Sequence, residues 1–250
     1  MCGRLVVVVP DLSELVAPFG VMQNVAGTWR PRFNLAPTEL APAITNDAER
    51  RLDLLHFGFA APWPTGTRSG RQLINARVET VAKLRSFRRA LALRRCIVPV
   101  SGYYEWQVQL GQKRPHFIHT ANGALLSLAG VWERWRARDG EEREGFAILT
   151  RPAEGFVREI HDRMPLVVPA PLIDAWLDPH ERELAALAPV LHAAPEIEAW
   201  TAHEVAPLVN TPNNDTPECL AEYTAPPPAP ERQLDLFAAV TPPTRLERES

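Results

Sequence analysis

The apolar residues of this chain fall in short runs separated by Pro, Gly and polar residues, a pattern typical of strands. Residues 4–9 are largely β-branched and apolar, and they predict a strand that is buried on both faces near the start of the chain. The same reasoning predicts strands at residues 51–59, 96–100, 102–108, 115–120, 125–133, 145–150 and 200–205, with a hairpin around Arg138, Asp139 and Gly140.

Helical periodicity is confined to a few segments. Residues 81–94 predict a helix whose core side carries Val81, Leu84, Phe87 and Leu91. A capping-box-like start at Asp11 predicts a short helix to about residue 19, and further short helices are predicted after Pro152 and at residues 180–187. Residues 29–38 are predicted to be a polar loop that its prolines extend, and residues 60–64 a rigid aromatic turn.

The composition is that of an ordinary globular protein: 250 residues, 46% of them hydrophobic, enough for a sizeable core in one or two domains. The apolar run at residues 5–9 is too short for a signal peptide or a membrane span, so a cytoplasmic location without membrane contact is expected. The three cysteines, Cys2, Cys96 and Cys219, lie far apart without a CxxC motif. This spacing argues against disulfides and a zinc site, and chemistry without a metal or cofactor is expected.

The net charge of -3 does not indicate nucleic acid, but the distribution of charge does. Between residues 68 and 95 the only acid is Glu79, and the basic residues are Arg68, Arg71, Arg77, Lys83, Arg85, Arg88, Arg89, Arg94 and Arg95. Such a cluster is either a solvated helix face or a surface that contacts phosphates, and the sequence leaves both interpretations open.

The first residues carry the clearest candidate chemistry. A small second residue permits removal of Met1, and Cys2 would then present an α-amine and a thiol together. An aldehyde reacts with this pair to give an imine and then a five-membered thiazolidine, and both groups titrate close to neutrality, at about 8 and about 8.5. The alternative is that Cys2 is a small apolar residue without a chemical role.

Three further residues are candidates for function, each with a structural alternative. Glu105 lies between two aromatic residues of a predicted strand, where desolvation would raise its pKa toward that of a general acid or base, unless it lies on an exposed face. His161 lies in a charged turn and could move protons at neutral pH or serve only structure. Trp63 could stack on a nucleotide base or cover the core.

Five motifs in order along the chain resemble the SOS-response-associated peptidase (SRAP) family, over residues 2 to about 222. They are Met1-Cys2-Gly3-Arg4, Asn34-Leu35-Ala36-Pro37, Asn75-Ala76-Arg77-Val78-Glu79-Thr80, Cys96-Ile97-Val98-Pro99 leading to Gly102-Tyr103-Tyr104-Glu105-Trp106, and His161-Asp162-Arg163-Met164-Pro165. The resemblance implies an α+β fold, with a distorted antiparallel barrel-like core and flanking helices.

The resemblance also implies an activity: the processed Cys2 forms a thiazolidine with the ring-opened aldehyde of an abasic site in single-stranded DNA. This thiol-dependent crosslink would protect the lesion during replication and the SOS response, close to the nucleoid. Asn75 would position the aldehyde, Glu105 would contact the α-amine and transfer protons, and His161 would act as acid or base on the sugar oxygen. Arg77 and Arg163 would hold phosphates, and the other residues expected at the DNA are Arg4, Asn34, Pro37, Trp63 and Arg85.

Two other functions fit the same residues. Cys2 could be the amino-terminal nucleophile of a cysteine peptidase that attacks an amide, including in its own processing, with its amine or His161 as base. The protein could also bind single-stranded DNA without any covalent step.

The composition changes at about residue 223, which predicts a domain over residues 1–222 and a Pro-rich, disordered tail over residues 223–250. Within the tail, Gln233-Leu234-Asp235-Leu236-Phe237 resembles the motif that binds the bacterial sliding clamp. In that motif Gln233 fits one pocket and the pair Leu236 and Phe237 fills a second, and Leu234 is also expected to contact the partner. The alternative is that this segment packs on its own domain.

Overall fold

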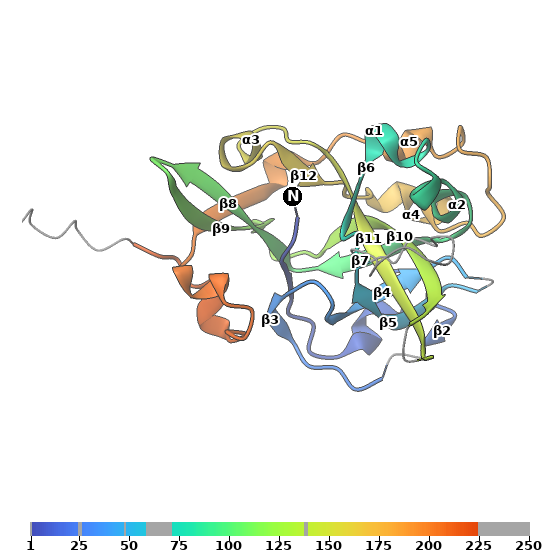
Figure 1. Cartoon of the computed structure of the whole chain (residues 1–250), viewed down its shortest axis with the longest axis horizontal. Helices are drawn as coiled ribbons and strands as arrows, with labels where there is room; N and C mark the ends of the chain where they lie inside the picture. Colours follow the sequence, from blue (N-terminus) through green and yellow to red (C-terminus); the bar gives the residue numbers. More distant parts are fainter. Residues whose placement is uncertain (1, 25–26, 48, 59–71, 138–139, 225–250) are drawn as a thin grey trace, which may run out of the picture.

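The computed structural model describes residues 2–24, 27–47, 49–58, 72–137 and 140–224 (Figure 1). The predicted turn at residues 60–64 with Trp63, and the tail with residues 233–237, therefore lie outside the described residues.

Five strands close into a barrel, which confirms the predicted antiparallel barrel-like core. They are β4 (Leu40–Thr45), β5 (Arg51–Phe57), β7 (Arg95–Val100), β10 (Leu126–Arg136) and β11 (Glu142–Pro152). Neighbours in the order β11-β10-β7-β4-β5 are antiparallel, and a parallel pairing of β11 with β5 closes the ring. A ring with an odd number of strands needs one parallel pair, and this pair is the seam of the barrel.

Glycine is required where the seam closes. In β11, Gly145 pairs with His56 of β5. A Cβ atom at Gly145 would lie 2.2 Å from the carbonyl oxygen of Gly58 and 2.8 Å from that of His56, closer than any real Cβ contact. The absence of a side chain therefore lets the two backbones approach.

A second sheet brings the amino-terminal strand to the site. Its order is β13 (Trp200–Glu204), β9 (Gln112–Thr120), β8 (Gly102–Gln109), β1 (Leu5–Val7) and β3 (Arg32–Leu35). The predicted strand at residues 4–9 is thus confirmed in its buried centre, where Leu5 pairs with Tyr103 of β8. Two short strands, β6 (Asn75–Arg77) and β12 (Arg163–Pro165), pair with β11, and β2 (Gln23–Asn24) pairs with β5.

Short helices flank the strands, as expected for an α+β fold (Figure 1). They are α1 (Val78–Val81), α2 (Arg85–Leu93), α3 (Val157–Ile160), α4 (Ile173–Trp176) and α5 (Ala188–Leu191). Short 3-10 helices lie at Leu12–Leu15, Ala170–Leu172, Ile197–Ala199, Pro207–Asn210 and Pro217–Leu220. Within the described residues, no helix combines the length and apolar character needed to cross a membrane.

The predicted helix at residues 81–94 is in fact two helices. Helix α1 ends at Val81, and Leu84 is extended and precedes α2, so its side chain is 47% exposed and not part of the core face. Phe87 and Leu91 are buried as predicted. The predicted helix at residues 11–19 is only a 3-10 turn at Leu12–Leu15.

The predicted helix at residues 180–187 is wrong, because local side chains and Arg95 take its backbone groups. Asp178 and Glu181 accept from the backbone N–H groups two residues later, which competes with helix formation. The buried guanidinium of Arg95 donates to the carbonyls of Asp178 and Glu181 and also to those of Trp176, Leu91 and Ala92. Arg95 is therefore an internal link between α2 and the segment after α4.

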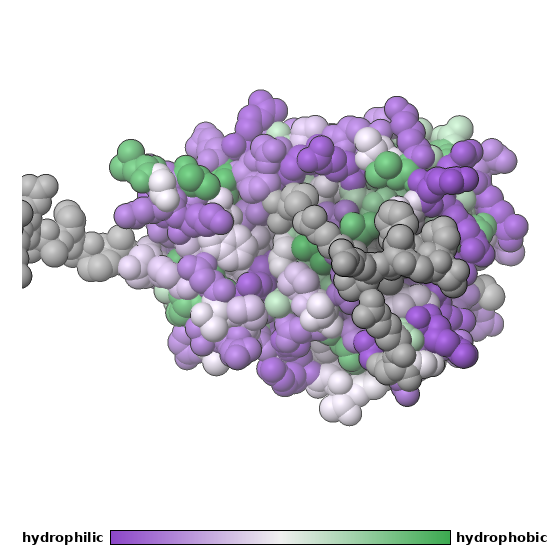
Figure 2. Space-filling view, viewed as in Figure 1, coloured by the Kyte–Doolittle hydropathy of each residue, from purple (hydrophilic) through white to green (hydrophobic). Residues whose placement is uncertain are grey.

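The surface is mostly polar in Figure 2, and one of its apolar areas lies at the tip of the β8–β9 hairpin. There Val108 is 67% exposed and Leu110 is 99% exposed. The hairpin projects away from the barrel in Figure 1.

Candidate active site

The amino-terminal segment is fixed by an amide from a neighbouring strand. Cys2 is fully buried, and its carbonyl accepts a hydrogen bond of 2.9 Å from Nδ2 of Asn75. Asn75 is held in place because β6 pairs with β11, where Asn75 lies opposite Ile148. The Oδ1 atom of Asn75 is buried and has no hydrogen-bond partner among the described residues. This amide therefore binds the backbone of Cys2 and keeps an acceptor beside it.

Glu105 is buried, as predicted from its aromatic neighbours. It lies in β8 with only 2% of its surface exposed. Burial raises the pKa of Glu105, while the positive charges of the amino terminus and of His161 act in the opposite direction. A carboxyl group with a raised pKa is suited to act as a general acid or base.

His161 lies opposite Glu105, immediately after α3. Its Nε2 atom is 3.9 Å from Oε2 of Glu105. The backbone N–H of Arg163 donates to Nδ1 at 2.9 Å, which places the proton of the neutral ring on Nε2, toward Glu105. The exposed carboxylate of Asp162 is also 2.9 Å from Nδ1. The structure thus brings together Cys2, Asn75, Glu105 and His161, which are more than 150 residues apart at the extremes.

The thiol of Cys2 is neutral in this environment. Burial raises the pKa of the Cys2 thiol well above its ordinary value, and the charge of Glu105 raises it further. All three cysteines are buried and unpaired.

Two arginines lie next to these four residues, and they differ in exposure and in their partners. Arg77 follows Asn75 in β6 and is exposed. Arg163 is only 11% exposed and makes a two-point ion pair with Glu79, with N–O distances of 2.5 and 3.0 Å. Its guanidinium also donates to the carbonyl of Thr150. The single acid of the basic cluster therefore neutralises one of the predicted phosphate ligands.

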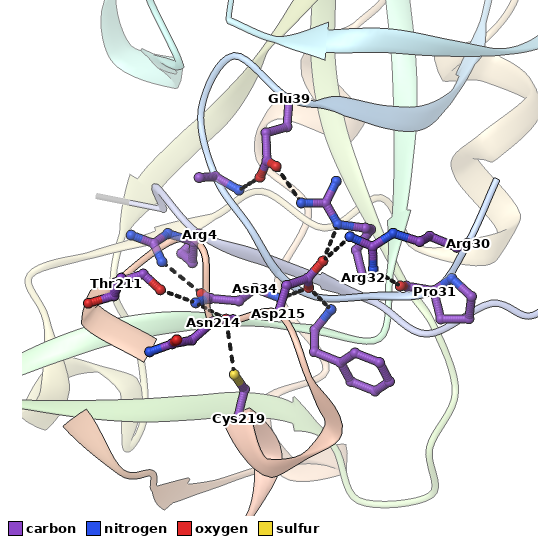
Figure 3. A network of polar contacts seen from close by, with 12 residues as sticks. Arg4, Arg30, Pro31, Arg32, Asn34, Glu39, Thr211, Asn214, Asp215 and Cys219 are labelled. Atoms are coloured by element: carbon purple, nitrogen blue, oxygen red, sulfur yellow. Dashed lines mark hydrogen bonds and ion pairs between the residues drawn. The ribbon is translucent and has the colours of Figure 1, made fainter. Parts of the chain in front are cut away.

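The network in Figure 3 shows what Arg4 and Asn34 contact. Asn34 is fully buried. Its Oδ1 atom accepts from Arg4 at 2.7 Å, and its Nδ2 atom donates to the carbonyls of Val209, Thr211 and Asn214. Arg4 also donates to Val209. In this structure both side chains join the amino-terminal segment to the carboxyl-terminal part of the domain, and the amide of Asn34 does not reach the surface.

Asp215 organises the same network and was not indicated by any sequence pattern. Its carboxylate accepts from the side chain of Arg32 and from the backbone N–H groups of Phe33 and Asn34. The predicted loop at residues 29–38 contains strand β3, which pairs with β1. Asp215 is about 180 residues from its partners along the chain, so periodicity and spacing carry no signal for it.

The other residues predicted to contact DNA are not brought to this group. Pro37 is half-buried in the turn between β3 and β4. Arg85 lies at the start of α2, well away from the amino terminus in Figure 1. It lines a hollow of about 690 Å³ together with Arg88, Arg89 and Arg182. Trp63 lies outside the described residues.

The fold and this group define an α+β protein in which a closed barrel and an adjoining sheet hold a thiol beside an amide, a carboxylate and an imidazole. The chain belongs to the SOS response associated peptidase (SRAP) family, whose model matches residues 1–212.

Similar proteins support this assignment. The chain is 33% identical to Abasic site processing protein YoaM of Bacillus subtilis over 225 residues, which cover 88% of this chain and 97% of that protein. It is 31% identical to Abasic site processing protein YoqW of the same organism, over 89% of this chain and all of that protein. Mouse Abasic site processing protein HMCES is 26% identical over 88% of this chain and 76% of its own length.

Solved structures have the same fold. A protein from Bacteroides thetaiotaomicron superimposes with a TM-score of 0.74 at 22% identity, over 89% of this chain and all of that one. A phage-related protein from Bordetella bronchiseptica has a TM-score of 0.66 at 28% identity, over 82% of this chain and 94% of that one. These comparisons confirm the predicted family and the α+β fold.

Proposed function

We propose that this protein captures abasic sites in single-stranded DNA covalently, through a thiazolidine on Cys2 after Met1 is removed. The observation that carries the proposal is the convergence of Asn75, Glu105 and His161 on the amino-terminal cysteine. The names of the relatives, abasic site processing proteins, point to the same substrate.

The reaction balances without a cofactor. The α-amine of Cys2 attacks the aldehyde carbon of the ring-opened sugar, and water leaves with the aldehyde oxygen to give an imine. The sulfur then adds to the imine carbon, and the thiol proton is transferred to the nitrogen. One S–C bond and one N–C bond form, and one water molecule is released per crosslink.

Each neighbour has a role that follows from its position. Glu105, with a raised pKa, accepts a proton from the attacking amine and returns it to the departing oxygen. His161 presents an N–H at Nε2 for the sugar oxygen. Asn75 fixes the backbone of Cys2 with Nδ2 and offers Oδ1 to the substrate.

The DNA contacts form the second part of the proposal. Arg77 is exposed beside the group and can bind a phosphate directly, whereas Arg163 must first leave Glu79. Trp63 is assigned to base stacking from its sequence. Arg4, Asn34 and Pro37 support the binding surface, and Arg85 belongs to a more distant basic region.

Intact mass of the purified protein tests the proposal. With a single-stranded oligonucleotide that carries one abasic site, the protein should lack Met1 and gain the mass of the oligonucleotide less one water. Cys2→Ala and Cys2→Ser should give no stable adduct, and an oligonucleotide whose abasic site has been reduced to the alcohol is the matched control. Retained Met1, or no adduct with the wild-type protein, would falsify the proposal.

Two further assays, one of peptide turnover and one of DNA affinity, separate the alternatives. A peptidase would turn over an amide substrate without an adduct, and a passive binder would retain full DNA affinity as Cys2→Ala.

The tail completes the proposal. We assign residues 1–222 to the domain that reacts with DNA, and Gln233, Leu234, Leu236 and Phe237 to contact with a bacterial sliding clamp. This contact would hold the protein at replicating DNA, which is consistent with a cytoplasmic, nucleoid-associated location.

A further inference from the structure

Tyr103 carries a buried hydroxyl group to which the described residues offer no hydrogen bond. The side chain is fully buried, and its oxygen has no hydrogen-bond partner among the described residues. Its neighbour Tyr104 is different, because its hydroxyl donates to the carbonyl of Phe33 at 2.8 Å and lies 3.2 Å from that of Cys219. A buried hydroxyl without a partner lowers stability, so its presence needs an explanation.

The geometry of β8 directs Tyr103 toward the reacting residues. Side chains two residues apart in a strand lie on the same face, so Tyr103 shares the face of Glu105, and Tyr104 lies on the other. Tyr103 is directly opposite Leu5 of β1, three residues after Cys2. Cys2 and Tyr103 belong to one apolar cluster, whereas Tyr104 belongs to the second cluster, with Cys219.

We propose that Tyr103 is a positioning residue whose hydroxyl donates a hydrogen bond to Sγ of Cys2 as the thiol loses its proton. This inference rests on the proposed function, because the negative charge on the Cys2 sulfur forms when the thiazolidine ring closes. A donor without a partner in the resting state gains one when negative charge develops on the sulfur, as donors do in an oxyanion hole.

The electrostatics of the three groups fit this role. Burial raises the pKa of the Tyr103 phenol well above its usual range, and negative charge on Cys2 or Glu105 acts in the same direction. The phenol therefore stays protonated and remains a donor. Burial and Glu105 disfavour the thiolate of Cys2, and the amino-terminal charge opposes them. A hydrogen bond from Tyr103 would act in the same direction as the amino-terminal charge.

The test compares Tyr103→Phe with Tyr104→Phe, two changes that each remove one oxygen from adjacent residues of β8. The first readout is the rate of Cys2 alkylation by iodoacetamide across a pH series, followed by mass mapping of the Cys2 peptide in protein that lacks Met1. The second is the crosslinking rate with an abasic oligonucleotide. Thermal unfolding of both variants reports folding.

We expect Tyr103→Phe to slow Cys2 alkylation and crosslinking near neutral pH by about 10-fold, since hydrogen bonds to charged groups are strong, and to move both pH profiles to higher pH. Its melting temperature should be equal to or above that of the wild type. Tyr104→Phe should melt at a lower temperature because the carbonyl of Phe33 loses its donor, with both profiles unchanged.

Other outcomes overturn the inference. Unchanged alkylation in Tyr103→Phe excludes a hydrogen bond to the sulfur, even if crosslinking slows, because the hydroxyl would then act on the DNA. If wild-type protein forms no crosslink at all, the proposed function fails, and the alkylation profile still decides the role of Tyr103.

Discussion

At the scale of single residues, Glu105 suits proton transfer at a cost in stability. Burial raises its pKa in the folded protein. Glu105 has a lower pKa in the unfolded chain than in the folded protein. At pH values between the two, the unfolded chain has lost the proton and the folded protein still holds it. The free energy of unfolding therefore falls as pH rises through this window and stays lower above it. Below the pKa of a glutamate in the unfolded chain, about 4.3, this loss of stability is absent.

Glu105→Gln should therefore stabilise the protein at neutral pH and prevent crosslinking. We expect a higher melting temperature at pH 7, by about 2–4 °C per kcal/mol of added stability, and no difference at a pH below 4. The crosslinking rate should fall by about 100-fold or more, as for loss of a general acid or base. Calorimetry at the two pH values and adduct mass against time measure the two effects. A variant less stable at both pH values would show that Glu105 is structural.

Glu79 controls a second residue of the site, because its carboxylate occupies Arg163. The hydrogen bond from Arg163 lowers the pKa of Glu79, so the pair is ionised at neutral pH. A DNA phosphate must compete with this carboxylate for the guanidinium.

Glu79→Gln should strengthen binding to undamaged single-stranded DNA by about three- to tenfold and steepen its salt dependence by about 0.7 for each additional phosphate that the protein neutralises. Fluorescence anisotropy over a salt series measures both. Glu159→Gln, which removes the same charge from the exposed surface of nearby α3, is the control for general electrostatics. Equal effects of the two variants, or weaker binding by Glu79→Gln, would contradict a specific competition at Arg163.

The sequence indicates site residues whose chemistry depends on their neighbours along the chain, and it misses residues whose contacts come from distant segments. Cys2, Glu105 and His161 have chemistry that their neighbours in sequence already suggest, namely a processed terminus, aromatic residues and charges. Asp215 and the contacts of Asn34 depend on a chain segment about 180 residues away. Tyr103 could have been found from strand alternation with Glu105, but only the structure shows that its hydroxyl has no partner among the described residues.

At the scale of elements, strands were predicted better than helices. A β10–β11 hairpin and strands β7 and β8 follow from β-branched and aromatic runs. Strand β4 was missed because Pro42 lies within it, and proline argues against an interior strand. Residues 180–187 do not form the predicted helix because buried Arg95 donates to the carbonyls of Asp178 and Glu181. The sequence suggested that Arg95 is a surface charge.

The closure of the barrel depends on one residue of β11, which leads to a prediction. Gly145→Ala should destabilise the protein by more than about 4 kcal/mol, or prevent folding, because its Cβ would collide with backbone atoms of Gly58 and His56. Gly27→Ala, where no atom lies within 4 Å of the added Cβ, should change stability by less than about 1 kcal/mol. Urea unfolding of both variants measures the difference. A mild effect at Gly145 would mean that the β11–β5 seam opens without loss of the fold.

At the scale of the whole molecule, the last described segment completes the domain. Residues 207–223 return to the amino-terminal half through Arg4, Asn34 and Asp215 (Figure 3). Cys219 is buried, and the backbone N–H of Tyr223 donates to Glu204 of β13. The contacts therefore continue to residue 223.

A chain that ends at Thr224 should therefore keep the reaction and lose the clamp. We expect its crosslinking rate with a free abasic oligonucleotide to equal that of the full chain, and its binding to a bacterial sliding clamp to be abolished. In the full chain, Leu236→Ala with Phe237→Ala should weaken clamp binding by about 10-fold or more, because each buried apolar side chain contributes about 1.5–3 kcal/mol. Leu246→Ala, an apolar tail residue outside the motif, is the matched control.

A kinetic comparison tests whether the tail acts by raising local concentration. A tethered partner is present at an effective concentration near the millimolar range for a short flexible linker. On DNA loaded with the clamp and at limiting protein, the full chain should therefore crosslink an abasic site faster than the chain ending at Thr224, and the two should be equal on bare DNA. If the truncated chain also reacts more slowly on bare DNA, the tail belongs to the reacting domain, because a tether cannot alter a rate where its partner is absent.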